Sequence, residues 1–235
     1  MRASIIIATR NRGHLLKMAL DSIWAHSYEG TEVIVVDDGS TDCTESVLRS
    51  FVKWPALRTK RIERNGGYRK NPGPVYNAAH NMATGDVHIE QSAETIHLTP
   101  SVDLLVAACV PGTMVLATVF KGSPLEMRAV RAAIEDGSYV YGKEFTETRP
   151  IVVGHHRQPK RHPVYGAQTI CGHDRPCPLM FLGAIHRDDW RTSGGYDHID
   201  RIGNDQRLAE AMISRGAKFT FLTRAIGFNL DHGKT

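Results

Sequence analysis

The chain has 235 residues, of which 41% are hydrophobic and 23% charged, and its formal net charge is +4. This length suffices for one well-filled core, and no run approaches the roughly 18 apolar residues that a membrane-spanning helix needs. The first residues are predicted to form a strand rather than a signal sequence, so we expect a single cytoplasmic domain over residues 1–235 with no transmembrane segment. The four cysteines show no paired spacing, which favours reduced thiols.

The chain begins with a predicted strand followed by an amphipathic helix. The strand covers Ser4 to Thr9, and apolar residues then recur at helical spacing from about Arg12 to Trp24. This pattern is typical of a helix packed on a sheet. Thr9 stands at the exit of the strand, where a loop residue often caps the following helix.

The segment VIVVDDGSTD, from Val33 to Asp42, organises the rest of the chain. Its β-branched residues run directly into two acids, a glycine and hydroxyl residues, as a buried parallel strand does where it ends before a helix. Open α/β sheets bind ligands beyond the carboxyl ends of their strands. Asp37 and Asp38 are therefore placed for binding, although an acid pair at this point also serves to cap a helix. The helix that follows buries Val47, Leu48 and Phe51.

Two successive strand–helix units imply parallel pairing with right-handed crossovers. A short third strand is predicted from Leu57 to Ile62, and a loop rich in Gly and Pro leads to a helix over Val75 to Ala83. We expect Gly85 to stop that helix. The fourth strand covers Val87 to Gln91 and is followed by Ser92, Ala93 and Glu94.

The second half of the chain is less regular. Apolar content predicts a helix from Val102 to Cys109 and a strand from Thr113 to Phe120, after which the pattern fails between Gly122 and Pro178. Basic residues gather at Arg58 to Arg64 and at Arg157 to Arg161. Such runs are usually solvated faces, and they leave an anionic partner open.

Order returns towards the end of the chain. A helix is predicted to begin near Asn204 and to end at Gly216, and a final strand covers Lys218 to Leu222. Asp205 lies in the first turn of this helix, where the dipole and the free N–H groups stabilise an ionised carboxylate. His232 lies in the tail beyond the strand.

Several of these segments together resemble the family-2 glycosyltransferases of the GT-A fold. The resemblance rests on SIIIATRN, VIVVDDGSTD, GPVYNAAHNMATGD and GGYD. In the third segment Asn77, Ala83, Gly85 and Asp86 match the family spacing, while Tyr76 replaces its usual Arg. The resemblance implies an α/β protein, a three-layer α/β/α sandwich with a mainly parallel central sheet. Residues 1–121 would bind a nucleotide sugar, and residues 122–235 would bind the acceptor and supply the catalytic base.

The resemblance also implies the donor-binding residues. They are Thr9, Asp37, Asp38, Asn77 and Ser92. One carboxylate of the Asp37–Asp38 pair would accept the imide N–H of uracil or a similar base. The turn Gly194 to Asp197 resembles a turn near the family's acceptor site, where Trp190 or Tyr196 would stack on a sugar ring.

The metal site departs from the family. Family members end the fourth strand in Asp-x-Asp, whose carboxylates hold a divalent metal, whereas this chain has Ser92, Ala93 and Glu94. Mg²⁺ and Mn²⁺ accept one carboxylate together with phosphate oxygens and water, so Glu94 is a candidate ligand. The family often draws another ligand from a histidine near the C-terminus, which points to His232. A metal-independent enzyme and an inactive homologue remain alternatives.

The catalytic base is also inferred from the resemblance. The family writes Glu-Asp at the start of the last long helix, with the Asp as general base. Asp205 takes that position, Asn204 replaces the Glu, and the distance to Gly216 matches. A helix cap would look the same.

The expected reaction is inverting transfer of a sugar, as by a hexosyltransferase, from a nucleoside diphosphate sugar, expected to be UDP-linked, to an acceptor hydroxyl on a carbohydrate or other molecule. One alternative is a nucleotidyltransferase, but the loop after the first strand is too poor in Gly for its phosphate loop. The other is a non-catalytic sugar-nucleotide or carbohydrate-binding module, which only the replaced aspartates support. Nothing in the sequence indicates the oligomeric state.

Overall fold

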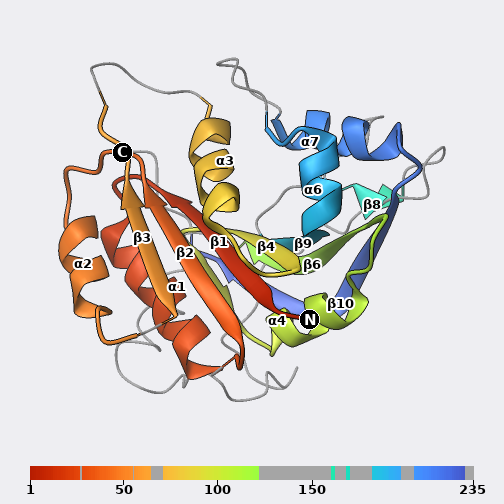
Figure 1. Cartoon of the computed structure of the whole chain (residues 1–235). Helices are drawn as coiled ribbons and strands as arrows, with labels where there is room; N and C mark the ends of the chain where they lie inside the picture. Colours follow the sequence, from red (N-terminus) through yellow and green to blue (C-terminus); the bar gives the residue numbers. More distant parts are fainter. Residues whose placement is uncertain are drawn as a thin grey trace.

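The computed structural model describes residues 1–26, 28–54, 56–64, 71–121, 160–161, 168–169, 182–196 and 204–230. In them, eight strands form one sheet in the order β3-β2-β1-β4-β9-β6-β10-β5 (Figure 1). The strands of this sheet are β1 Ala3–Thr9, β2 Thr31–Asp37, β3 Leu57–Arg61, β4 Val87–Ser92, β5 Thr95–His97, β6 Thr113–Lys121, β9 Leu182–His186 and β10 Lys218–Asn229. The helices are α1 Gly13–Ala25, α2 Thr44–Ser50, α3 Gly73–Met82, α4 Ser101–Ala108, α6 Arg187–Ser193 and α7 Asn204–Ile213. Two short strands, β7 Lys160–Arg161 and β8 Gln168–Thr169, pair separately.

The strand directions bring most carboxyl ends to one edge of the sheet. Strands β3, β2, β1 and β4 are parallel to one another, as predicted, and β6 is parallel to β10. Strand β9 is antiparallel to both β4 and β6, so β6 and β10 run in the same direction as β1. One edge of the sheet therefore holds the carboxyl ends of β1, β2, β4, β6 and β10, and it is at this edge that open α/β sheets bind ligands.

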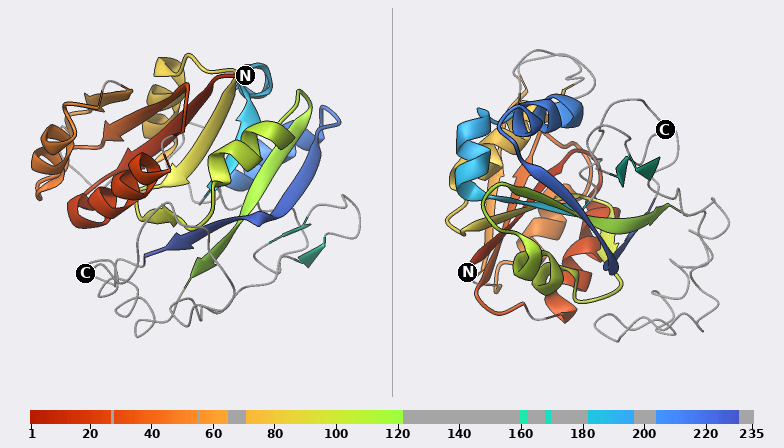
Figure 2. Two further views of the ribbon diagram at one scale, coloured as in Figure 1. Left: turned by 90° about the horizontal axis from the view of Figure 1, so that it is seen from below. Right: turned by 90° about the vertical axis from the view of Figure 1, so that its right-hand side faces the viewer.

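Helices cover both faces of the sheet (Figures 1 and 2). Leu16 and Leu20 of α1 and Leu105 of α4 pack in one core cluster with Ile5 and Ile7. On the opposite face α3 packs on the residues that alternate with these in β1 and β2, and α6 and α7 share a further cluster with β6 and β9. The predicted three-layer α/β/α architecture is confirmed.

Two strands of the sheet have no clear signal in the sequence. Strand β5 has only three residues, two of which are the buried polar residues Thr95 and His97. Strand β9 is an apolar run of five residues too short to show a period. The last strand is longer than expected and reaches Asn229, because a register shift after Leu222 lets it resume pairing with β6 at Ile226.

Gly85 is required by packing and not by helix termination. Helix α3 ends at Met82, with Ala83 in an extended conformation as its cap, and Gly85 does not adopt a positive φ. The predicted role of Gly85 as helix stop is therefore wrong. A Cβ atom at Gly85 would lie 2.7 Å from the carbonyl carbon of Ala3 and 2.8 Å from the backbone nitrogen of Ser4. The bare backbone lets the start of β4 approach the start of β1.

We expect Gly85→Ala to destabilise the fold by roughly 1–3 kcal/mol or more, because the clashing atoms belong to the backbone of a central strand and cannot move aside. Gly30→Ala is the matched control, since a Cβ atom at Gly30 meets nothing within 4 Å and only its φ of +68° opposes the substitution. Urea unfolding of both variants measures the difference. A smaller loss of stability for Gly85→Ala than for Gly30→Ala would contradict the close-approach argument.

Candidate functional site

Three of the predicted donor-binding residues lie at the carboxyl edge of adjacent strands. Thr9 is the register partner of Asp37 across β1 and β2, and Ser92 pairs with Ala8 across β4 and β1. Neighbouring strands are roughly 4.8 Å apart, so Asp37 and Ser92 are separated by about 10 Å across the sheet. This distance is suited to one extended ligand.

The loops that leave β1 and β2 are tied to each other. The backbone N–H of Asn11 donates to Ser40 Oγ at 2.9 Å, and Asn11 Oδ1 accepts from the Thr41 N–H at 2.8 Å. Asp42 accepts from the N–H groups of Gly13 and Thr44, at 2.9 and 3.0 Å. Burial alone would raise the pKa of Asp42, but the hydrogen bonds from Thr44 and Gly13 lower it. A charged side chain thus holds the starts of α1 and α2 together beside the edge.

Asp37 supports the loop that follows β2. Its side chain is on the α1 face of the sheet by alternation with Val33 and Val35, and it is 2% exposed. Asp37 Oδ1 accepts from the Ser40 N–H at 2.9 Å, and Oδ2 accepts from Arg61 Nη1 at 2.8 Å. Arg61 Nη2 also donates to Ser40 O at 3.1 Å. The whole turn is therefore closed around this carboxylate.

Asp38 points the other way, towards the face that α3 covers. Alternation places it with Ile34 and Val36 of the α3 cluster. Its backbone N–H donates to Thr9 O at 2.9 Å, and its Oδ2 accepts from Nε of Arg64 at 3.1 Å and from Arg64 Nη2. The sequence did not distinguish the two acids, whereas the structure gives them opposite faces and different partners.

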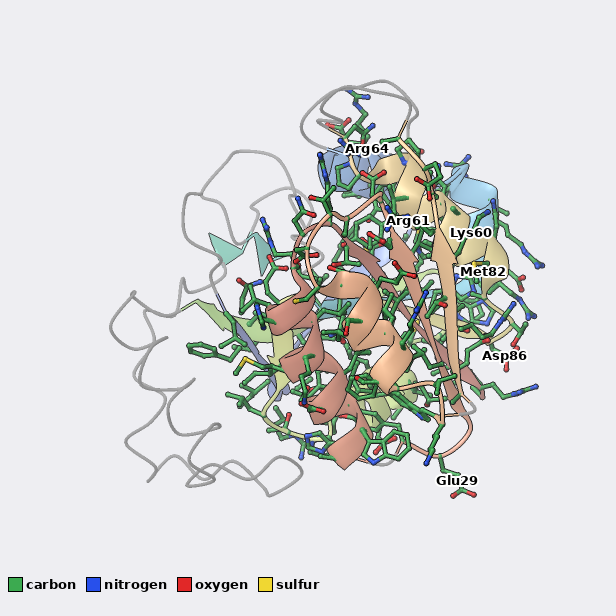
Figure 3. All side chains as sticks on the ribbon, turned by 90° about the vertical axis from the view of Figure 1, so that its left-hand side faces the viewer. Glu29, Lys60, Arg61, Arg64, Met82 and Asp86 are labelled. Atoms are coloured by element: carbon green, nitrogen blue, oxygen red, sulfur yellow. The ribbon has the colours of Figure 1, made fainter. Side chains whose placement is uncertain are left out.

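The basic run from Arg58 to Arg64 is not simply a solvated face. Arg61 and Arg64 turn to the two acids, and the Arg64 side chain is only 10% exposed. Figure 3 shows both arginines at this end of the molecule, far from Glu29 at the other end. Carboxylates withdrawn from water need such partners, and a sequence pattern does not reveal which strand supplies them.

Two buried polar atoms at the end of β1 have no hydrogen-bond partner among the described residues. They are Thr9 Oγ1 and Arg10 Nε. Thr9 is 4% exposed, and most buried polar atoms in native proteins are satisfied. Both atoms are therefore available to a ligand. Arg10 was not singled out from the sequence, although its place directly after Thr9 was a signal.

Asn77 joins α3 to the turn after α6. Its Nδ2 donates to Tyr196 O at 2.8 Å, and its Oδ1 accepts from the Tyr196 N–H at 2.9 Å. The amide is thus engaged with the protein backbone, and the expected contact of Asn77 with the donor stays a prediction. The expected stacking of Trp190 or Tyr196 on a sugar is wrong, because they are 5% and 3% exposed and pack in the core.

The candidate metal ligands are Glu94 and His232. Glu94 lies in the turn between β4 and β5, half-buried, and its carbonyl oxygen accepts from the Leu230 N–H at 2.9 Å. The chain therefore reaches Glu94 two residues before His232, which lies outside the described residues. In the described part of the chain no three His, Cys, Asp or Glu side chains form a group that could hold a metal. A single carboxylate still fits Mg²⁺ or Mn²⁺ when substrate phosphates and water complete the shell.

Asp205 lies in the first turn of α7, as predicted, and Gly216 adopts the positive φ of a helix end. Leu208 and Met212 of this helix pack in the cluster on the α6 face. Residues 214–217 lead directly from α7 into β10, whose start lies at the amino edge of the strands. The first turn of α7 is therefore directed towards the carboxyl edge, on the face to which Asp38 points.

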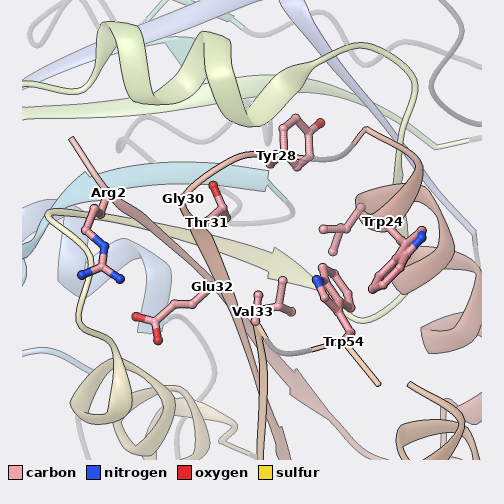
Figure 4. Close-up of a pocket in the computed structure, with 10 residues that line it drawn as sticks. Arg2, Trp24, Tyr28, Gly30, Thr31, Glu32, Val33 and Trp54 are labelled. Carbon is pink, nitrogen blue, oxygen red and sulfur yellow. The ribbon is translucent and has the colours of Figure 1, made fainter. Parts of the chain in front are cut away.

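Two cavities flank the sheet. One, of about 330 Å³, lies between α2 and β3 and includes Asp37 and Arg61 in its wall. The other, of about 600 Å³, is at the amino edge of β2 (Figure 4). Figure 4 shows Arg2 and Glu32 on one side of β2 and Trp24 and Trp54 on the other, so its polar and aromatic walls do not converge on one ligand.

The first part of the chain matches a family model. Residues 4–109 match the model described as glycosyl transferase family 2. An uncharacterised glycosyltransferase of Nostoc sp. is 33% identical over 88 residues, which are 37% of this chain and 26% of that protein. The chain thus spans about a quarter of the length of that relative.

Solved structures share the fold. The mannosyltransferase PcManGT of Pyrobaculum calidifontis, in complex with GDP-Man and Mn²⁺, has a TM-score of 0.64 at 20% identity and covers 99% of this chain and 58% of its own. TarS residues 1–349 of S. aureus, in complex with UDP-GlcNAc, has a TM-score of 0.65 at 15% identity and covers 100% of this chain and 60% of its own.

The sheet and its carboxyl edge define the GT-A class of α/β protein. Within that class residues 4–109 are similar to the family-2 glycosyltransferases, in agreement with the resemblance drawn from the motifs. No helix in the described ranges is both long enough and apolar enough to cross a membrane.

Buried histidines lie on both faces of β4. Burial lowers the pKa of His88 to about 4, with the charges of Arg187 and Arg191 as further causes. Burial, and then His88, lowers the pKa of His80 well below its usual value. On the other face burial, and then His26, lowers the pKa of His97 to about 3. All three are neutral at pH 7.

We expect the free energy of unfolding to fall as pH drops from about 6.5 to 4. In this window the unfolded chain binds a proton at each of these histidines and the folded chain does not, at a cost of up to ~1.4 kcal/mol per pH unit for each. His88→Gln should therefore reduce the slope of the free energy of unfolding against pH by the contribution of about one proton. Urea unfolding across this pH range measures it, with exposed His14→Gln as the control for loss of a histidine. An unchanged slope in His88→Gln would refute the assignment.

Proposed function

We propose that this chain transfers a sugar from a nucleoside diphosphate sugar to an acceptor hydroxyl, with inversion at the anomeric carbon. The observation that carries the proposal is the carboxyl edge itself, where Asp38 pairs with Arg64 at the end of β2 and the Thr9 hydroxyl at the end of β1 has no partner among the described residues. The neighbours in complex with GDP-Man and with UDP-GlcNAc support a nucleotide sugar as donor. Residues 1–121 would bind the donor, and residues 122–235 would bind the acceptor.

Asp38 is the acid proposed to read the base. It faces the same side of the sheet as α7, and Arg64 holds its carboxylate from one side. A carboxylate accepts the imide N–H of uracil, which favours a UDP-linked donor. Asp37 keeps the turn closed through Ser40 and Arg61, so its contribution to binding is indirect. Thr9 and Arg10 offer a hydroxyl and a guanidinium N–H to the donor.

Glu94 and His232 would hold a divalent metal, Mn²⁺ or Mg²⁺, beside Ser92. The fit rests on the Glu94 carboxylate as an oxygen ligand for the metal. It also rests on the hydrogen bond from Leu230 to Glu94, because Leu230 lies two residues before His232. When bound, the metal supplies positive charge that stabilises a departing diphosphate. Ser92 lies half-buried at the end of β4 and offers its hydroxyl to the sugar-nucleotide donor.

Asp205 is the proposed general base. The first turn of a helix favours its ionised form, and an ionised carboxylate can accept the proton of the acceptor hydroxyl as that hydroxyl attacks. Attack on the face opposite the departing diphosphate gives inversion in one displacement. The direction of α7 towards the carboxyl edge supports this role.

A non-catalytic nucleotide-sugar-binding module is the second candidate. The observation in its favour is that Ser92 and Glu94 replace the two metal-binding aspartates of the family, which leaves one carboxylate. A nucleotidyltransferase is less well supported, because the loop after β1 is organised by the side chain of Asn11 and not by a run of glycines.

Calorimetry with UDP- and GDP-linked sugars, with and without Mn²⁺, tests the donor. We expect a UDP-sugar to bind, and Asp38→Asn to weaken binding by about 10- to 100-fold through loss of a charge-assisted hydrogen bond to the base. Asp37→Asn is the matched variant and should lower stability more than affinity. Normal affinity in Asp38→Asn together with lost affinity in Asp37→Asn would reverse the assignment.

The base is tested by transfer from the bound donor to a panel of p-nitrophenyl glycosides. We expect Asp205→Asn to lower kcat by roughly 10²–10⁴-fold, the usual contribution of a general base, while donor affinity stays the same. Glu210→Gln, which changes an exposed acid of the same helix, controls for effects on α7. Donor binding by the wild type without turnover under any metal would favour the binding module instead.

A further inference from the structure

A carboxylate lies buried in the middle of the central sheet, where an apolar residue is expected. Glu90 belongs to β4, between β1 and β9, and is 1% exposed. Burying an acid is costly unless its oxygens are hydrogen-bonded, and a well-packed apolar residue would cost nothing comparable. The partners of Glu90 therefore indicate why an acid occupies this position.

Both carboxylate oxygens of Glu90 are engaged. The Tyr196 hydroxyl donates to Oε1 at 2.5 Å, and His80 Nε2 lies 3.0 Å from Oε2. These partners come from different parts of the chain, since His80 belongs to α3 and Tyr196 follows α6. Glu90 thus joins the sheet to α3 and to the turn after α6.

The arrangement of protons in this cluster follows from its geometry. His80 Nδ1 and His88 Nδ1 are 2.8 Å apart, so one proton lies between them. Both imidazoles are neutral and each carries one N–H. If His80 donates from Nε2 to a charged Glu90, its Nδ1 accepts from His88 Nδ1–H. His88 Nε2 is then a bare acceptor, in agreement with its lack of a partner among the described residues.

Aromatic packing extends the cluster to α6. Trp190 stacks on His80 with ring centroids 3.4 Å apart and an angle of 7° between the planes. Its ring meets Tyr196 nearly edge-on at 5.2 Å. Gly195 allows this contact, because a Cβ atom there would lie 2.9 Å from Asn77 Oδ1 and 3.0 Å from Trp190. The two Asn77 hydrogen bonds hold the Tyr196 backbone in the same place.

Helix α7 packs against this cluster. Leu208 and Met212 belong to the same hydrophobic cluster as Trp190 and Tyr196, and α7 lies beside α6 (Figures 1 and 2). Leu208 is 1% exposed and stands one helical turn after Asp205. The rings that Glu90 and His80 orient therefore belong to the cluster in which Leu208 and Met212 of α7 are packed.

We propose that Glu90 is a positioning residue that sets the place of α7, and so of Asp205, relative to the sheet. It acts through Tyr196 directly and through His80 on Trp190. The catalytic meaning rests on the proposed function, in which Asp205 is the base. The placement of α7 is a separate physical claim that is measured without substrate.

The neighbouring residue of the same strand provides the contrast. Gln91 is also fully buried, but it points to the opposite face, where it donates to Thr95 O at 3.0 Å and lies 2.8 Å from His97 Nε2. Its network ends at β5 and at Tyr28, on the face away from α7. Glu90 and Gln91 are thus adjacent in β4 but make their hydrogen bonds on opposite faces of the sheet.

Hydrogen exchange of backbone amides in Glu90→Gln tests the placement of α7. The amide keeps the shape of the acid but replaces one acceptor by a donor, so it satisfies the two partners less well. We expect exchange in α7 and in residues 194–196 to rise at least about tenfold, which corresponds to losing ~1.4 kcal/mol locally, while β1 and β2 keep wild-type rates. Tyr196→Phe removes only the hydroxyl and should give the same pattern if Glu90→Gln folds poorly.

Gln91→Leu is the matched control, because it breaks a buried network of similar size on the other face. It should leave exchange in α7 at the wild-type rate. A uniform rise over the whole sheet in Glu90→Gln and Tyr196→Phe would show a merely structural role and overturn the proposal. Unchanged exchange in α7 in both variants would overturn it as well.

Nitrogen-15 NMR of the histidine side chains tests the proposed arrangement of protons between Glu90, His80 and His88. We expect the proton of His80 on Nε2 and that of His88 on Nδ1. The reverse pair of tautomers would mean that Glu90 is protonated and donates, which would overturn its role as a charged acceptor.

Activity provides the last measurement. Glu90→Gln should lower kcat for transfer to the p-nitrophenyl glycosides about tenfold or more with unchanged donor affinity, and should have little effect when Asp205→Asn is already present. An equal loss in both backgrounds would show that Glu90 does not act through Asp205. If the wild type binds no sugar nucleotide, the proposed function fails, and the exchange experiment still decides whether Glu90 positions α7.

Discussion

The structure depends on carboxylates that are withdrawn from water and must be paired. Asp37, Asp38 and Glu90 are each less than a tenth exposed, and each is held by side chains from another segment. Arg61 and Arg64 serve the first two, and the third has His80 and Tyr196. An unpaired buried charge is costly, so these contacts select the conformations of the loops and helices that supply the partners.

The pairing explains how one edge of a sheet becomes a site. Parallel strands bring Thr9, Asp37 and Ser92 to the same edge, and alternation then divides their side chains between two faces. Asp37 turns to the α1 face and closes a loop, whereas Asp38 turns to the face that carries α3 and α7. A donor at this edge and a base at the start of α7 would then lie on the same side. The proposed chemistry requires that arrangement.

Local patterns were informative where an element is repeated or long. The first two strand–helix units, the helix from Asn204 to its closing Gly216 and the family motifs were all predictable, because period and turn residues are local properties. Trp190 and Tyr196 were expected to stack on a sugar ring, and Gly85 was expected to stop a helix. In each case a distant segment decides the outcome: the His80 and Glu90 partners for the rings, and the start of β1 for the glycine.

The amino-acid sequence by itself determined the α/β class, the likeness of its first part to family-2 glycosyltransferases and the carboxyl edge at which the candidate residues gather. It also contained Glu90, but without a sign of its importance, since a single acid in a strand has no pattern. Only the tertiary structure decided which acid faces α7, which arginines hold the acids and which rings support the helix of Asp205. These are contacts between residues far apart in the chain, and a buried charge selects them by partner and distance, which spacing along the chain does not encode.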